Sequence, residues 1–399
     1  MIAAIAMPRL MRIGAGASLE LGSILTQLGL SRPLIVTDSH LVEIGKLEKV
    51  MASLDSSKFR PRLFTKVVLD PTVASIENCL AFLKAGDHDC VVGFGGGSSM
   101  DTAKMVAVRA VHGGAVSSYK APHMQDAPGL PIICVPTTAG TGSEATRFTI
   151  ISDEKTNEKM LCIGVGFLPT ASLVDYEQSF TMPKDLTAAT GLDALCHALE
   201  GFVSKRTHPF SQNIAVQAMR AIAPNLRRAY ADPNHRFARE AVMLGATLAG
   251  LAFSNSSVAL IHGMARPIGA FFHVAHGLSV AMLMPAVIEF TAPADLALYA
   301  NASRAMGLAT EAGSNESAVA RLINEYIQFN QDLNVPTPKS YGIDPARWNS
   351  LLPTMAEQAI ASGSPANNPR AASAEEIQQL YKAAWAGEET RKLYKTAKA

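Results

Sequence analysis

The sequence contains few cysteines, and their spacing forms no recognisable pair. Five cysteines are scattered through 399 residues, with no CxxC arrangement and an odd total. Small disulfide scaffolds and zinc knuckles both depend on paired or closely spaced cysteines. We therefore interpret these residues as reduced thiols, and we expect a cytoplasmic protein without a disulfide frame.

Excess charge and long apolar runs are also scarce. Lys and Arg number 35 against 34 Asp and Glu, a net charge of +1, which lacks the basic excess that nucleic-acid backbones require. No uninterrupted apolar run reaches the roughly 18 to 20 residues of a membrane span. The apolar residues 1–9 lack the basic region of a signal peptide, and we interpret them as an N-terminal strand. The sequence thus predicts neither a nucleic-acid nor a membrane partner.

The first half of the chain has the pattern of a parallel α/β fold. Hydrophobic residues make up 48% of the sequence, and this length exceeds what a single core usually serves. Alternation of buried strands and helices favours a Rossmann-like parallel sheet with helices on both faces. The strands are predicted at 33–38, 90–94 and 130–135, and the helices at 41–54, 75–85 and 98–112.

After about Pro183 the pattern changes to long helices rich in Ala, Leu and Met. We therefore expect a dinucleotide-binding α/β domain at 1–182 and an all-α metal and substrate domain at 183–399. The cleft between them is the expected active site. Helices are predicted most clearly at 185–204, 210–229 and 237–254, and a loop at 362–374.

A glycine run follows the predicted strand 90–94 and precedes the helix that carries Asp101. Three glycines allow the backbone to approach a phosphate closely, and a helix N-terminus adds positive partial charge. We interpret the run as a pyrophosphate cradle; the alternative is a glycine-rich connection without a ligand. The run consists of Gly95, Gly96, Gly97, Ser98 and Ser99.

Two further features indicate a dinucleotide site. The loop 136–144 follows a strand and carries Thr137, Thr138 and Thr141, whose hydroxyls suit phosphate, ribose or nicotinamide contacts. An ordinary helix cap is the alternative. Asp38 ends the predicted strand 33–38, where an acidic side chain binds ribose and repels a 2′-phosphate. This favours NAD over NADP, unless Asp38 is a plain turn residue.

The second half contains candidate metal ligands. Asp193 and His197 lie four residues apart in a predicted helix, so both project from one face, although such a pair can also be a surface pair or a cap. His262 and His276 lie in apolar sequence, where each could instead be a buried histidine bonded to a carbonyl. Together these residues favour a metal site. A set of three nitrogens and one oxygen suits Fe²⁺ or Zn²⁺, with Mn²⁺, Co²⁺ and Ni²⁺ as alternatives.

Four motifs occur in an order that resembles the iron-containing alcohol dehydrogenases, a family related to glycerol dehydrogenase, maleylacetate reductase and the dehydroquinate synthase-like fold. The resemblance spans about residues 8–385. It implies a dinucleotide-binding domain followed by an all-helical metal domain. The motifs are GGGSSMDTAK at 95–104, PTTAGTGSE at 136–144, GLDALCH at 191–197, and HGMA with a later HG within 262–277.

The resemblance also implies roles. Hydride would pass reversibly between a small alcohol or aldehyde and NAD, with the ion polarising the substrate oxygen. The resemblance places Lys159, like the glycine and threonine loops, at a cofactor-binding position. Asp38 falls on the position that selects NAD over NADP. We expect Fe²⁺, with Zn²⁺ as the alternative, in a homodimer or larger homo-oligomer. The implied ligands are Asp193, His197, His262 and His276.

One residue departs from the family pattern. Many members carry a histidine four residues after the third ligand, whereas this chain has Arg266. Its planar cation suits a carboxylate, so we hypothesise a hydroxy acid or its oxo counterpart as substrate; pairing with a protein acid or carbonyl is the alternative. His273 is the candidate replacement proton carrier.

Competing functions are a maleylacetate-reductase-like NAD(P)H-dependent reductase without metal, a lyase of the dehydroquinate synthase type, and a non-catalytic nucleotide-binding relative.

Overall fold

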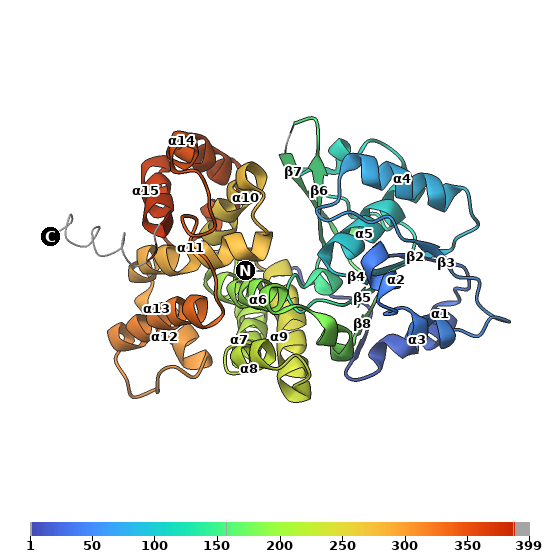
Figure 1. Ribbon diagram of the computed structural model, residues 1–399, viewed down its shortest axis with the longest axis horizontal. Coiled ribbons are helices and arrows are strands. Elements are labelled where there is room, and N and C mark those ends of the chain that lie inside the picture. Colours follow the sequence, from blue (N-terminus) through green and yellow to red (C-terminus); the bar gives the residue numbers. More distant parts are fainter. Residues whose placement is uncertain (1, 157, 386, 388–399) are drawn as a thin grey trace. The chain divides into compact units, whose positions relative to one another are not determined.

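The chain folds into two compact units, Met1–Thr181 and Met182–Ala399. The computed structural model describes residues 2–156, 158–385 and 387 (Figure 1). The end of the predicted helical domain, 388–399, lies outside the described residues.

The first unit is built on a six-stranded sheet in the order β1-β8-β5-β4-β2-β3, in which every pair is parallel. A separate antiparallel pair consists of β6 (Phe148–Asp153) and β7 (Glu158–Ile163). The predicted parallel α/β fold is confirmed. The N-terminal strand begins at Leu10, later than the predicted residues 1–9. The sheet strands are β1 (Leu10–Ile13), β2 (Pro33–Val36), β3 (Arg62–Phe64), β4 (Cys90–Gly95), β5 (Ile132–Pro136) and β8 (Ala171–Val174).

Helices cover both faces of this sheet, and each face has its own core. Successive strand residues point to opposite faces. Leu34 and Val36 of β2 therefore join one core, with side chains from α4 (Val73–Lys84) and α5 (Gly97–His112). Ile35 joins the other core. That second core also takes side chains from α1 (Leu21–Leu28) and α3 (Glu48–Ala52).

Two predicted helices are each divided in the structure. The predicted helix 41–54 forms α2 (Ser39–Glu43) and α3, because Gly45 between them adopts a φ of +71° that favours glycine. The predicted helix 210–229 forms α7 (Pro209–Ile222) and α8 (Leu226–Ala231). Pro224 lies between these two helices, and it lacks the N–H that a continuous helix needs.

The strand order identifies where this sheet would bind a ligand. The chain passes from β2 outward to β3, but from β4 in the opposite direction to β5. Open parallel sheets bind ligands at the carboxyl ends of two neighbouring strands whose connections diverge in this way. Asp38 follows β2 and the glycine run follows β4, so both lie at this switch point.

The described part of the second unit is helical. Helix α6 (Lys184–Val203) is buried at every residue from Gly191 onward. It packs against α7, α9 (Arg236–Ser254) and α11 (His276–Thr291) (Figure 1). The predicted helices 185–204 and 237–254 correspond to α6 and α9. The predicted loop 362–374 contains a short 3-10 turn, Ser364–Asn367. The other helices are α9 (Arg236–Ser254), α10 (Leu260–Phe272), α11 (His276–Thr291), α12 (Leu296–Ala305), α13 (Asn315–Asp332), α14 (Pro345–Ala361) and α15 (Ala374–Trp385).

Two helical segments, Arg236–Ser254 and His276–Ala294, are long and apolar enough to cross a membrane by length and composition alone. In each of them 67% of the most apolar 18-residue stretch is buried inside the fold. Apolar helices in the core of a large protein have this same character. We therefore interpret both segments as core helices.

Substituting Gly277 by alanine should destabilise the protein. A Cβ at this position would lie 2.4 Å from the carbonyl oxygen of Ala189 and 3.2 Å from Cβ of Asp193. G277A must therefore move the start of α11 away from α6. We expect a loss of about 1–3 kcal/mol in the free energy of unfolding, measured with denaturant, although alanine favours helices.

G313A is the matched control. A Cβ at Gly313 would find its nearest neighbour, the carbonyl oxygen of Thr310, at an ordinary contact distance of 3.5 Å. Equal stability of the two variants would show that the close approach of α11 to α6 does not constrain Gly277.

Candidate metal centre and cofactor loops

Three helices bring an aspartate and two histidines together. Oδ1 of Asp193 on α6 lies 3.4 Å from Nε2 of His262 on α10 and 3.8 Å from Nε2 of His276 at the start of α11. The three donor atoms all lie within 4.8 Å of one another. An ion with bonds of about 2.0–2.2 Å can bridge two ligand atoms up to about 4.4 Å apart. Both distances to Asp193 therefore suit a single ion.

His197, the fourth predicted ligand, lies beside this group. Its Nδ1 is 4.0 Å from Oδ2 of Asp193. Its ring stacks on Phe253 and on His262, with centroids 4.2 Å and 4.4 Å apart. The structure thus gathers all four predicted residues, and it places Asp193, His262 and His276 in the tighter set.

The electrostatics of the group call for a cation. Burial raises the pKa of Asp193. The neighbouring His197, His276 and His262 together lower it by a larger amount, so this pKa lies well below its usual value. Burial lowers the pKa of His262, but two carboxylates, Asp193 and Glu200, raise it to about 9. Both shifts arise because buried negative charge needs positive charge beside it. A divalent ion supplies that charge as well as a proton does.

The unused hydrogen-bonding atoms also fit a metal ion. Oδ1 of Asp193 and Nε2 of His262 are buried, and neither forms a hydrogen bond with any described residue. Buried polar atoms of this kind normally have a partner. Imidazole nitrogen and carboxylate oxygen are ligands that Fe²⁺ and Zn²⁺ accept. These residues therefore fit the ion that the sequence predicts.

Glu200 is a residue of this site that the sequence analysis missed. It lies on α6, three residues after His197, and its side chain is 3% exposed. Oε2 lies 2.6 Å from Nδ1 of His262 and accepts the N–H of Ala259 at 2.8 Å, while Oε1 accepts the N–H of Ile261 at 2.7 Å. An acidic residue in a long apolar helical segment was the available signal.

Cys196, Glu200 and His262 form a second group with metal-like spacing. Three hydrogen-bond contacts, however, already engage the two oxygens of Glu200. Burial, and then the charge of Glu200, raise the pKa of Cys196 well above its usual value, which keeps the thiol protonated. Metal ions bind the thiolate form. We therefore interpret this group as a hydrogen-bonded support for His262.

The two predicted catalytic residues, Arg266 and His273, differ in their exposure to solvent. Arg266 lies four residues after His262 on α10, and it is partly buried. Burial lowers the pKa of its guanidinium, and the Glu200 carboxylate opposes this shift. Within the described chain, Arg266 makes no hydrogen bond and no ion pair shorter than 4.0 Å. His273 ends α10 with a φ of +55°, and its side chain is exposed.

The glycine run, at the switch point of the sheet, lies against the threonine loop, which follows the neighbouring strand β5. The N–H of Thr137 donates to the carbonyl of Gly95 at 2.9 Å. A Cβ on Gly97 would lie 3.0 Å from Cγ2 of Thr141, and one on Gly96 would lie 3.3 Å from Cγ2 of Thr138. The two loops therefore pack closely at these glycines, and a side chain there would have to displace a threonine methyl group slightly.

The start of α5 is suited to an anion. No side chain caps this helix, whose N-cap residue is Gly96. Its first N–H groups therefore have no intrahelical partner, and they carry positive partial charge. Oγ1 of Thr138 is buried, and no described residue hydrogen-bonds to it. A pyrophosphate fits these donors.

Asp101, another predicted cofactor residue, has protein partners. The partly buried carboxylate of Asp101 accepts the hydroxyl of Ser143 at 2.8 Å and the N–H of Ile150 at 3.0 Å. Burial raises the pKa of this carboxyl, and the charge of the nearby Lys104 opposes that shift. Asp101 therefore ties the threonine loop and β6 to α5.

Lys159 and Asp38 complete the predicted cofactor set. Nζ of Lys159 lies 3.0 Å from Oδ2 of Asp70, whose N–H donates to Oγ of Ser98 at 3.3 Å. Lys159 is thereby linked to the glycine run. Oδ1 of Asp38 accepts the N–H of Leu41 at 2.9 Å and caps α2.

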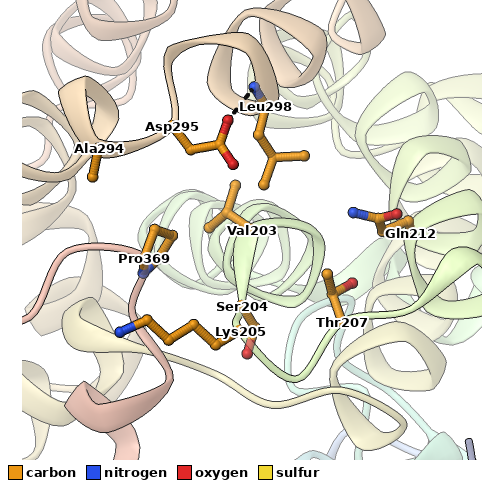
Figure 2. A pocket seen from close by; sticks show the side chains of 9 residues that line it. All are labelled: Val203, Ser204, Lys205, Thr207, Gln212, Ala294, Asp295, Leu298 and Pro369. Carbon is orange, nitrogen blue, oxygen red and sulfur yellow. Dashed lines mark hydrogen bonds between the residues drawn. The ribbon is translucent and has the colours of Figure 1, made fainter. Parts of the chain in front are cut away.

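A separate pocket lies in the helical unit, away from the predicted residues. Figure 2 shows Asp295 turned toward the start of α12, where its Oδ1 accepts the N–H of Leu298 at 3.0 Å. No residue predicted for the site lines this pocket. It is lined by Val203, Ser204, Lys205, Thr207, Gln212, Ala294, Asp295, Leu298 and Pro369.

Known proteins are similar to this chain over nearly its whole length. The family model for iron-containing alcohol dehydrogenase matches residues 8–176, and the model for the C-terminal part of the Fe-containing alcohol dehydrogenase family matches residues 187–385. Long-chain-alcohol dehydrogenase 1 of Geobacillus thermodenitrificans is 36% identical over 390 residues, which cover 97% of this chain and 98% of that protein.

Two more relatives agree. The NAD-dependent methanol dehydrogenase of Bacillus methanolicus is 32% identical over 371 residues, covering 93% of this chain and 96% of that protein. A crystal structure of 1,3-propanediol oxidoreductase superposes with a TM-score of 0.92 at 31% identity, covering 96% of this chain and all of that one.

A parallel α/β unit followed by a helical unit with a buried Asp/His group is thus the fold of an oxidoreductase that acts on CH–OH groups. The chain belongs to the iron-containing alcohol dehydrogenase family, whose enzymes are NAD-dependent alcohol dehydrogenases. The family resemblance inferred from the four motifs is confirmed.

Proposed function

We propose that this protein is a metal-dependent, NAD-linked alcohol dehydrogenase. The observation that carries the proposal is the group formed by the buried Asp193 and His262 and the partly exposed His276, whose donor atoms lie within 4.8 Å of one another. His197 beside it completes the proposed ligand set. Fe²⁺ is the expected ion and Zn²⁺ the alternative. The retained ligand set favours this function over a reductase that works without metal.

The dinucleotide is proposed to bind to the first unit, at the carboxyl ends of β2 and β4. The uncapped start of α5 supports a pyrophosphate position, and Asp38 after β2 supports a ribose position. The similarity to the NAD-dependent methanol dehydrogenase of Bacillus methanolicus supports NAD as the acceptor. The proposed cofactor residues are Asp38, Gly95, Gly96, Gly97, Ser98, Ser99, Asp101, Thr137, Thr138, Thr141 and Lys159.

The residues around the metal position have distinct tasks in this proposal. When bound, the divalent ion acts as a Lewis acid on the substrate oxygen, and NAD exchanges hydride with the substrate carbon. The buried charge of Asp193 holds the cation in a dry environment. The ring of Phe253 stacks on His197 and keeps its imidazole in place. The exposed His273 can exchange a proton with solvent.

The wider setting is proposed from the family resemblance. Residues 1–182 would bind the dinucleotide, and 183–399 would bind the metal and the substrate. The enzyme would be a cytoplasmic homodimer or larger homo-oligomer that acts on a small alcohol, aldehyde or hydroxy acid. Light scattering on the purified protein tests the assembly, since a monomeric mass would contradict it.

Metal content and NAD reduction test the function together. Protein purified without air or chelator should contain close to one Fe or Zn ion per chain by plasma mass spectrometry. A panel of alcohols, diols and hydroxy acids should support NAD reduction that chelation abolishes. D193N should retain less than about a tenth of the metal, because it replaces an anionic ligand by a neutral amide.

D185N is the matched control, because Asp185 is an exposed residue of the same helix α6. It should bind metal like the wild type. A metal-free wild type that still reduces NAD would indicate the metal-independent reductase. A protein with neither metal nor activity would indicate a non-catalytic relative.

Arg266 is proposed to bind a substrate carboxylate. The absence of a hydrogen bond or ion pair to Arg266 from any described residue supports this role. R266Q should lower kcat/KM for hydroxy acids by roughly 10- to 150-fold relative to neutral alcohols of equal length, the effect of losing about 1.5–3 kcal/mol from a charged hydrogen bond. R321Q, at an exposed arginine, is the control. Equal losses of kcat/KM for hydroxy acids and for neutral alcohols would instead indicate that Arg266 balances the charge of Glu200 and does not bind the substrate.

His273 is proposed to carry the proton. A general base contributes about 10²- to 10⁴-fold to turnover. H273A should therefore lower kcat by at least 10²-fold near neutral pH and alter its dependence on pH, whereas H123A, at an exposed histidine of the other unit, should change neither. If H273A retains the wild-type turnover and pH profile, the proton follows another route.

A further inference from the structure

Glu200 connects two of the helices that carry the proposed ligands. It belongs to α6, as Asp193 does, and its carboxylate reaches the first residues of α10, where His262 lies. The contacts to the N–H of Ala259, the N–H of Ile261 and Nδ1 of His262 measure 2.8, 2.7 and 2.6 Å. A buried carboxylate with this many partners has a defined orientation.

Helix α10 depends on this contact because it has no cap of its own. Its N-cap residue, Ala259, has no side chain that can accept a hydrogen bond. The first N–H groups of a helix need an acceptor when they are buried. Glu200 supplies that acceptor from another helix. The position of His262, in the first turn of α10, therefore depends on Glu200.

The same carboxylate determines which nitrogen of His262 carries the proton in the neutral ring. An ionised carboxylate only accepts hydrogen bonds, so Nδ1 must be the donor at 2.6 Å. Nε2 then has a free lone pair, and it lies 3.4 Å from Oδ1 of Asp193. Metal-binding histidines commonly donate their other N–H to a carboxylate, which fixes the ring and makes it a stronger ligand.

We propose that Glu200 is the positioning residue of the metal centre: it selects the tautomer of His262, fixes its ring and joins the start of α10 to α6. Glu200 itself does not bind the ion, because hydrogen-bond donors already engage both of its oxygens. This inference rests on the proposed function, since it requires that Asp193, His262 and His276 bind a metal.

Metal affinity tests this role directly. The protein is stripped with chelator, and its Kd for Zn²⁺ and Co²⁺ is measured by competition with a chelating dye. E200Q keeps the size of the side chain and loses its charge. We expect E200Q to bind both ions about 10- to 100-fold more weakly, the usual effect of losing such a partner. The visible absorption of bound Co²⁺ should also shift, because the ligand field of His262 changes.

S256A separates positioning of His262 from general support of the helices. The hydroxyl of Ser256 lies within hydrogen-bond distance of the carbonyls of Gly201, at 3.0 Å, and Ala252, at 2.9 Å, so it attaches the chain just after α9 to α6, and neither of these hydrogen bonds involves a proposed ligand. S256A should lower the unfolding free energy by about 1 kcal/mol. Its metal affinity and its Co²⁺ spectrum should remain those of the wild type.

E200D keeps the charge with a shorter reach, and it should bind metal with an affinity between those of E200Q and the wild type. If E200Q does not fold, the metal affinity of E200D alone tests the positioning role. Wild-type affinity in E200Q or E200D, or equal losses in E200Q and S256A, would overturn the positioning role and leave the proposed function intact. A wild type that binds no metal would overturn the proposed function itself.

Discussion

The buried carboxylate of Asp193 imposes the main constraint on the helical unit. An isolated charge in a helical core costs several kcal/mol unless positive charge lies beside it. Histidines from α6, α10 and α11 surround this carboxylate, although they lie far apart in the sequence. Helix α11 must come very close to α6 to achieve this, and glycine at position 277 permits that approach. Charge balance and packing therefore lead to the same arrangement of three helices.

Two buried carboxylates have different roles because their surroundings differ. Oδ1 of Asp193 makes no hydrogen bond to a described residue, so it can bind an ion. Both oxygens of Glu200 are engaged by donors from α10. Residue type alone predicts the same chemistry for both. The hydrogen-bond partners of each oxygen distinguish the proposed ligand, Asp193, from its proposed support, Glu200.

Sequence patterns predicted those parts of the structure that depend on local chemistry. The strand at 90–94 was found to within a residue, because a buried parallel strand is a continuous apolar run. The prediction of one continuous helix at 41–54 was wrong, because a single glycine with positive φ divides that segment into two helices. Glu200 could not be assigned a role in advance, because Ala259 and Ile261 bind it through backbone N–H groups about sixty residues away. A backbone donor leaves no pattern in a sequence.

The formal charges around the proposed metal site bear on its substrate. The carboxylates of Asp193 and Glu200 and the guanidinium of Arg266 together carry one negative charge, so a bound divalent ion would leave the site with one positive charge. A neutral histidine in place of Arg266, the residue that the family resemblance leads us to expect there, would leave no net charge. A low-dielectric site with excess positive charge attracts anions more strongly than a neutral one. This charge balance supports the proposed anionic substrate, whether Arg266 binds the carboxylate itself or balances the charge of Glu200.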